Sequence, residues 1–164
     1  MITVYQNGEL HFRNKVYKCA LGRNGIKKRK QEGDGCTPEG TYSLGPLYYR
    51  SDRIKKLRTH FNAIAIEKNM YWSDAPHSEH YNKLIRFKDS SYENLYKINH
   101  TYDIVIVINY NNKPIISGKG SAIFIHLAKK DFSPTSGCIA LRKECIFEIL
   151  EKLDTTDKIK IISH

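Results

Sequence analysis

Hydrophobic and polar residues alternate along much of the chain with the period of two that is typical of β-strands. Residues 2–12 contain two short alternating runs joined by Asn7-Gly8, a dipeptide that favours a β-hairpin with a type I′ turn. Residues 16–22 continue as a strand that ends in glycine. The beginning of the chain is therefore predicted to be β-structure.

The middle of the chain is predicted to be rich in strands as well. Residues 32–50 begin with turn-forming residues and then alternate, as a loop that leads into a strand does. Residues 60–68 are rich in β-forming residues. Residues 102–110 form an almost continuous apolar run, which suits a strand covered on both faces.

One helix is predicted, and it lies late in the chain. Four aliphatic residues recur there at helical spacing: Ile146, Ile149, Leu150 and Leu153. Residues 158–164 then close the chain as a last alternating strand. Because no repeat, low-complexity tract or linker interrupts the pattern, we expect one β-dominated α+β domain over residues 1–164.

Composition agrees with a folded domain of ordinary size. The 164 residues are 40% hydrophobic and 27% charged, close to the averages of globular proteins. A chain of this length buries enough surface to be stable without disulfides. The four cysteines contain no CxxC pair, so we expect reduced thiols, with Cys19 and Cys145 as packing residues.

The first residues and the hydropathy pattern bear on location. The stretch MITVYQNGELHF lacks the basic start, the apolar stretch and the cleavage site of a secretory signal. No run of about 18 apolar residues is present, so no membrane span is expected. These features favour the cytoplasm, and removal of a leader would favour the periplasm instead.

The net charge of +10 calls for an acidic partner. The densest basic stretch is residues 23–35, and eleven tyrosines could stack on single-stranded nucleic acid. No nucleic-acid-binding motif accompanies them, however, so nucleic acid is an unlikely partner. A solvated loop, or attraction of a small acidic substrate, explains the charge better.

The strongest candidate for chemistry is a histidine that precedes a cysteine by one short loop. In the strand expected before this loop, Ile123, Ile125 and Leu127 share one face, whereas Phe124 and His126 share the other. A single histidine in an apolar run is commonly a hydrogen-bonded core residue. A nearby thiol gives this one a second possible use, as the base of a cysteine nucleophile.

The cysteine in question, Cys138, follows a tight turn that contains Ser136 and Gly137. A glycine there allows close approach of a substrate, and successive N–H groups in such a turn can stabilise an oxyanion. Zinc is the competing use of these side chains. The spacing of His126, Cys138 and Cys145 matches no common zinc pattern, so we expect neither a metal nor a cofactor.

Residues 125–141, IHLAKKDFSPTSGCIAL, resemble the active-site signature of the YkuD-type L,D-transpeptidase catalytic domain family. In that signature a histidine is followed, after a variable loop, by a Ser/Thr-x-Gly-Cys core. The family's loop before a substrate-facing strand resembles residues 32–45. Its approach to the catalytic histidine resembles residues 118–126. Residues 71–87 resemble its short, leaderless branch, and the resemblance extends over roughly residues 15–145.

The resemblance implies a β-sandwich or mixed-sheet domain with a helix after the catalytic cysteine. It also implies acyl transfer on a peptidoglycan stem tetrapeptide, in which Cys138 attacks the L-centre carbonyl and terminal D-alanine leaves. His126 would manage the proton, and N–H groups near Gly137 and Cys138 would stabilise the oxyanion. Many members have histidine at the position of Ser136 and arginine at that of Ala140, so acceptor and substrate preference depend on other residues here.

Two further expectations concern the substrate. Tyr81, Asn82, Arg86 and Arg142 are candidate binding residues for the peptide carboxylates. A cytoplasmic protein meets free muropeptides and abundant water, which favours an L,D-carboxypeptidase of murein recycling over a cross-linking transpeptidase. The resemblance leaves the oligomeric state open.

Two other functional classes remain open from the sequence. One is a non-catalytic basic module that binds wall fragments or nucleic acid, whose affinity would depend on salt and survive Cys138→Ala. The other is a cysteine peptidase acting on all-L peptides. An enzyme, whether an L,D-transpeptidase or a cysteine peptidase, would carry one unusually reactive cysteine and form an acyl adduct on Cys138.

Overall fold

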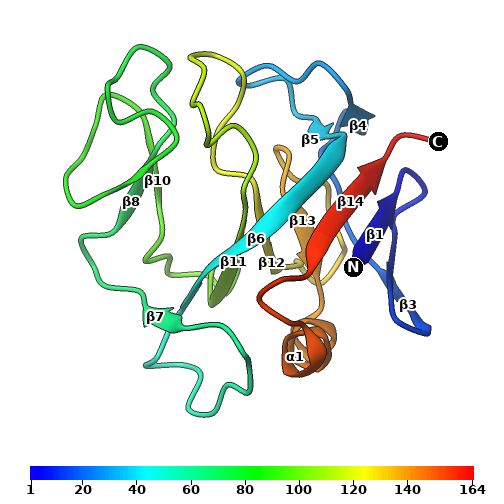
Figure 1. Ribbon diagram of the computed structural model, residues 1–164. Helices are drawn as coiled ribbons and strands as arrows, with labels where there is room; N and C mark the ends of the chain where they lie inside the picture. Colours follow the sequence, from blue (N-terminus) through cyan, green and yellow to red (C-terminus); the bar gives the residue numbers. More distant parts are fainter.

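The computed structural model describes residues 1–164 as short strands and a single helix (Figure 1). The strands are β1 (Ile2–Tyr5), β2 (Glu9–Phe12), β3 (Lys15–Lys18), β4 (Ile26–Lys27), β5 (Thr37–Pro38), β6 (Gly40–Tyr49), β7 (Ala63–Ala65), β8 (Tyr71–Ser73), β9 (Leu84–Ile85), β10 (Tyr92–Asn94), β11 (Ile104–Ile108), β12 (Phe124–Leu127), β13 (Ile139–Leu141) and β14 (Lys158–Ile162). The helix, α1 (Lys143–Lys152), follows β13. The prediction of a β-dominated α+β fold with one late helix is confirmed.

A nine-stranded mixed sheet organises the fold, in the order β13-β12-β11-β6-β14-β1-β2-β3, with β7 paired to β6. In Figure 1 the long strand β6 crosses the molecule, with β14 and β1 on one side of it and β8 and β10 on the other. Isolated bridges join Ala20 to Ala140 and Gly22 to Thr135. The chain that follows β3 therefore returns to β13 at the opposite end of the strand order, and the sheet nearly closes on itself.

Alternation along the central strands divides the apolar residues between two clusters. Ile104 and Ile106 of β11 belong to the larger cluster, whereas Val105 and Val107 belong to the smaller one. All five residues of β11 are buried, which confirms the prediction of a strand covered on both faces. The same alternation in β12 turns Ile125 to the larger cluster and the neighbouring Phe124 to the smaller.

The N-terminal hairpin is confirmed, but the predicted type I′ turn is wrong. Because Tyr5 pairs with Glu9, the turn contains three residues, Gln6, Asn7 and Gly8. Only Gly8 has a positive φ, of 83°, and its N–H donates to the Tyr5 carbonyl. A three-residue loop with glycine in the left-handed region replaces the two-residue turn.

The helix packs as its pattern predicts. Ile146, Ile149 and Leu150 are buried, Glu144 lies in the first turn and Lys152 in the last, where each charge suits the helix dipole. No helix in the structure combines the length and the apolar character needed to cross a bilayer.

Candidate active site

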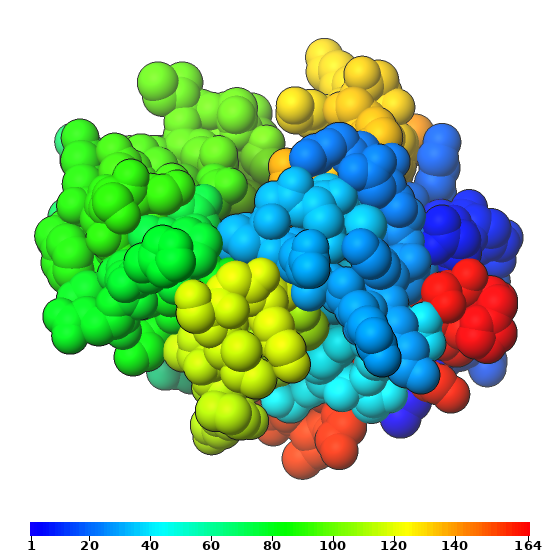
Figure 2. Space-filling view, turned by 90° about the horizontal axis from the view of Figure 1, so that it is seen from above, coloured from blue at the N-terminus to red at the C-terminus, as the bar shows by residue number.

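A cavity of about 430 Å³ opens beside β12 and the loop before β13. Its walls come from four parts of the chain: residues 23–33, Asp74, residues 93–102 and residues 121–140. In Figure 2 these blue, green and orange segments meet on one face of the molecule. The volume falls within the range of sites that bind one small ligand.

The parallel pairing of β12 with β13 brings His126 and Cys138 to this cavity. His126 pairs with Ala140, and Ile125 pairs with Ile139. Cys138 lies one residue before β13, so it stands two positions from Ala140 and on the same face. His126 and Cys138 are therefore diagonal neighbours on adjacent strands, and both side chains line the cavity.

A backbone carbonyl fixes the tautomer of His126. The Nδ1 atom lies 2.9 Å from the carbonyl oxygen of Leu127. Because a carbonyl only accepts hydrogen bonds, Nδ1 carries the proton and Nε2 keeps its lone pair. Burial lowers the pKa of His126 to about 4, so the imidazole is neutral at neutral pH and its Nε2 can accept a proton.

This low pKa predicts that stability falls in mild acid. Above pH 6.5 the imidazole is neutral in both states; between pH 6.5 and about 4 only the unfolded chain binds the proton. Lowering the pH through that window therefore costs about 3 kcal/mol of unfolding free energy at this position. Urea denaturation of the native protein and His126→Gln at pH 7 and pH 4 measures it, with a smaller loss expected for the variant. Equal losses of unfolding free energy in the two proteins would contradict the low pKa of His126.

The thiol of Cys138 is buried between two backbone groups. Its Sγ lies 3.2 Å from the Ala122 carbonyl, to which the thiol donates, and accepts from the Phe124 N–H at 3.4 Å. Burial raises the pKa of Cys138 to about 12, so the resting side chain is a neutral thiol. This environment does not favour the unusually reactive resting thiol expected from the sequence. A neutral thiol of this kind can attack only if it gives up its proton during the reaction.

The turn before Cys138 is held by Thr135. The Thr135 Oγ1 donates to the Cys138 carbonyl at 2.6 Å and accepts from the Gly137 N–H at 3.1 Å. The Cys138 N–H, in contrast, donates no hydrogen bond within the protein. Gly137 has a φ of 145°, and a Cβ there would lie 2.8 Å from the Cys36 carbonyl oxygen. Only glycine suits this position, and the N–H of Cys138 is left without an acceptor in the protein.

Ser136 is exposed at the cavity wall. Its Oγ accepts a long hydrogen bond of 3.4 Å from the Arg23 Nη1, and the structure shows no contact between this hydroxyl and His126. Ser136 therefore lines the cavity, and its catalytic role stays a prediction.

Tyr81 and Asn82 are both buried and do not line the cavity. The Tyr81 hydroxyl donates to Glu32 Oε1 at 2.8 Å and accepts from the Gly120 N–H at 2.9 Å. Its contacts support the loop before β12, which is a structural use. The predicted role of both residues in substrate binding receives no support from their positions.

Asn82 instead positions the backbone that contacts the thiol. Its Oδ1 accepts from the Ala122 N–H at 3.1 Å and from the Trp72 Nε1 at 3.0 Å. Ala122 has a φ of 52°, an uncommon conformation for a residue with a side chain, and its carbonyl accepts the Cys138 thiol. One residue, Ala122, therefore links the Asn82 amide to the Cys138 thiol.

Replacing Asn82 by glycine is expected to lower kcat about 10- to 100-fold with little change in KM. Glycine accepts the φ of 55° at this position, but the Ala122 and Trp72 donors lose their acceptor. Steady-state kinetics on tetrapeptide checks this, with Ile159→Ala as a control that destabilises the core of the larger cluster. An equal fall in kcat for the control would show that Asn82 acts only through stability.

The two arginines of the predicted substrate site lie elsewhere. Arg86 is exposed and pairs with Glu67 at 3.0 Å. Arg142 precedes α1, with its guanidinium 5.3 Å from the centre of the Phe132 ring. Neither lines the cavity, so the structure does not bring them together with His126 and Cys138.

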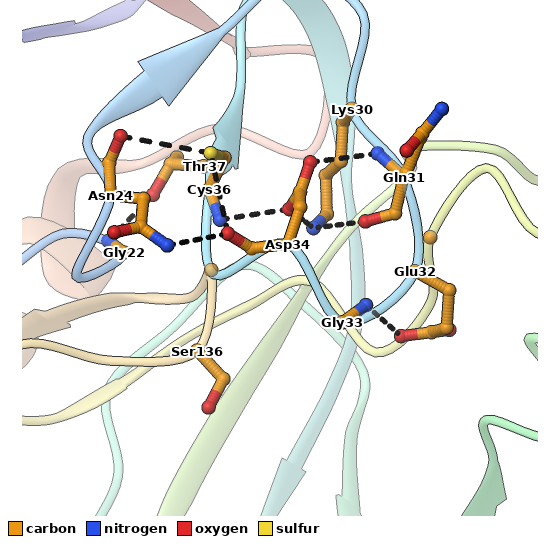
Figure 3. Close-up of polar contacts among 12 residues, drawn as sticks. Gly22, Asn24, Lys30, Gln31, Glu32, Gly33, Asp34, Cys36, Thr37 and Ser136 are labelled. Atoms are coloured by element: carbon orange, nitrogen blue, oxygen red, sulfur yellow. Dashed lines mark hydrogen bonds and ion pairs between the residues drawn. The ribbon is translucent and has the colours of Figure 1, made fainter.

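Sequence reasoning missed Lys30, which lines the cavity as a buried cation. It lies in the loop before β5, where Figure 3 shows it beside Gln31, Asp34 and Cys36. The basic stretch around it was interpreted as solvated, and Lys27, Lys28 and Arg29 are indeed exposed. The only sequence signal for Lys30 was the acidic Asp34 four residues later.

Comparison with known proteins agrees with this geometry. A solved structure of Bdellovibrio bacteriovorus Bd1075 aligns with 100% of this chain and 48% of that chain, at 14% identity and a TM-score of 0.51, a likeness that shows the fold. The chain thus spans about half the length of that protein. A search of curated proteins finds no match. The family model described as YkuD, L,D-transpeptidase catalytic domain, matches residues 1–161, and the chain therefore belongs to this family.

Proposed function

We propose that this protein cleaves the bond between the L-centre of the third residue and the terminal D-alanine of peptidoglycan stem tetrapeptides, through a thioester on Cys138. The observation that carries the proposal is the placement of Cys138 and His126 on one face of paired strands, beside one cavity. Membership of a family of L,D-transpeptidase catalytic domains supplies the class of reaction.

The proposed reaction has two stages. In the first, the Cys138 sulfur attacks the L-centre carbonyl carbon while its proton moves to the Nε2 of His126. The C–N bond then breaks, and His126 returns that proton to the amine of the leaving D-alanine. In the second, His126 takes a proton from water as the water oxygen attacks the thioester carbonyl. The C–S bond then breaks, His126 returns that proton to the Cys138 sulfur, and the tripeptide acid ionises to its carboxylate.

The environment of the two side chains supports this sequence. A neutral thiol and a neutral imidazole with a free Nε2 are the protonation states that general-base attack requires. The Cys138 N–H, which has no acceptor in the protein, would donate to the oxyanion of the tetrahedral intermediate.

Water is the acceptor in this proposal, which makes the enzyme an L,D-carboxypeptidase. A cavity of about 430 Å³ suits the reacting end of a single peptide, whereas cross-linking requires a second peptide at the same carbonyl. Its substrates would be muropeptides recovered into the cytoplasm during murein recycling. Finding the native protein in periplasmic extracts and not in cytoplasmic ones would contradict that location.

Mass spectrometry of the products tests the proposal. Free tetrapeptide is incubated with the protein, with and without an added D-amino acid. Formation of tripeptide and D-alanine in both mixtures is expected. Exchange of the terminal residue would instead establish transpeptidation, and an intact tetrapeptide would overturn the proposed activity. If the protein cleaved an all-L isomer as well as the natural tetrapeptide, it would be an ordinary cysteine peptidase.

One observation favours a second candidate, a basic binding module. Lys28, Arg29 and Lys119 are exposed and line a neighbouring cavity of about 980 Å³, which shares Lys30 and Glu32 with the first. A module of this kind would bind wall fragments or nucleic acid with an affinity that falls as salt rises. Titration with each ligand at two salt concentrations, on the native protein and on Cys138→Ala, separates this function from catalysis, because simple binding would not need the thiol.

A further inference from the structure

The cavity that contains Cys138 also contains a buried cation, Lys30. Only 3% of its side chain is exposed, although lysine is among the residues least often buried. Burying an ammonium is costly unless the charge is paired and hydrogen-bonded. The position of Lys30 at the cavity wall is therefore a specific feature of this site.

The surrounding loop holds Lys30 in place and leaves one of its three N–H donors without an acceptor. Its Nζ donates to Asp34 Oδ1 at 2.8 Å and to the Gln31 carbonyl at 3.3 Å (Figure 3). Since an ammonium carries three N–H donors, one has no acceptor in the protein. Asp34 is itself fixed, because it accepts from the N–H groups of Gln31 at 2.8 Å and Cys36 at 2.9 Å.

These contacts keep Asp34 ionised beside the lysine. Burial raises the pKa of Asp34, but the hydrogen bonds from Lys30, Gln31 and Cys36 outweigh burial and hold that pKa below its usual value. The ion pair therefore fixes the ammonium without removing its third donor.

Lys30 lies close to the loop that carries the nucleophile. A Cβ added to Gly137 would be 3.5 Å from Lys30 Nζ, so the ammonium faces the residue next to Cys138. Arg23 adds a second cation on this wall, beside Ser136. The acidic neighbour Glu32 is already engaged, because its Oε1 accepts from Tyr81 and Ser121.

We propose that Lys30 binds a substrate carboxylate, and that it selects peptides whose C-terminal carboxylate is free. This inference rests on the proposed function, in which the leaving D-alanine carries a carboxylate next to the bond that breaks. A charge-assisted hydrogen bond from a fixed ammonium is stronger than one between neutral groups. A C-terminal amide would lose that bond and the charge attraction.

The test compares a tetrapeptide with its C-terminal carboxamide. The native protein is expected to favour the free acid about 10- to 100-fold in kcat/KM. Lys30→Met should lower kcat/KM for the acid towards that for the amide, and change the amide little. Lys27→Met, at an exposed lysine of β4 that lines neither this cavity nor the larger basic one, should keep the native preference. The double variant Lys30→Met/Asp34→Asn avoids leaving a carboxylate unpaired and should behave as Lys30→Met does.

Binding measured without turnover separates the two proposals. Calorimetric titration of Cys138→Ala with the acid and the amide should show tighter binding of the acid, and the preference should vanish in Cys138→Ala/Lys30→Met. An acid preference unchanged by Lys30→Met, or no preference in binding, would overturn the inference about Lys30. Acid-selective binding without turnover by the native protein would overturn the proposed activity and leave the carboxylate site standing.

Discussion

Cys138→Ala is expected to lower the rate of D-alanine release by about 10⁴-fold or more. The variant has no sulfur to form a thioester, and no other cysteine lines the cavity. Cys138→Ser should be similarly inactive, because a hydroxyl is harder to deprotonate than a thiol and this one would be buried. Chromatographic assay of D-alanine at saturating tetrapeptide measures the effect.

The matched control is Cys145→Ala, which removes a half-buried thiol of α1 that does not line the cavity. It should retain the native rate. Circular dichroism and thermal unfolding show whether each variant is folded. A folded Cys138→Ala protein with more than about a tenth of the native rate would require another nucleophile, or direct attack by water.

His126→Gln is expected to lower kcat about 10²- to 10⁴-fold. Glutamine can still donate a hydrogen bond towards the Leu127 carbonyl, but it cannot take the proton of the Cys138 thiol. Binding should change less than kcat, since the side chain acts on the reacting atoms. Measurement of kcat and KM for the tetrapeptide, with Ile159→Ala as a stability control, separates the two effects.

The pH profile provides an independent check on His126. Only the neutral imidazole accepts a proton, and burial lowers the pKa to about 4. In the native protein kcat/KM should therefore change little from pH 8 to pH 5 and fall as the pH approaches 4. An acid limb centred near pH 6.5 would mean that the imidazole is solvated or charged in the working enzyme, contrary to its buried position.

The sequence predicted the parts of the site that local patterns encode. Alternation in residues 123–127 placed His126 on the face opposite the aliphatic row, and the Ser/Thr-x-Gly-Cys core singled out Cys138. Both predictions depend on near neighbours in the chain. The pairing of β12 with β13 then brings the two side chains to one cavity.

The remaining features depend on contacts between distant segments. Asn82 meets Ala122 across 40 residues, so its hydrogen bonds have no local signature, and its polar side chain was interpreted as a substrate contact. Lys30 belongs to a basic stretch, and only the folded loop buries it while its neighbours stay in solvent. Likewise, a regular alternation predicted β14, but not its central place between β1 and β6.

The most direct test of the account is to trap the acyl-enzyme. The protein is mixed with tetrapeptide, quenched in acid at short times and examined by intact-protein mass spectrometry and peptide mapping. We expect a mass increase equal to the tripeptide acyl group. The adduct should be located on Cys138, be released by hydroxylamine and accumulate only while tetrapeptide remains. Release of D-alanine without any adduct on Cys138, or with the adduct on another residue, would contradict this expectation.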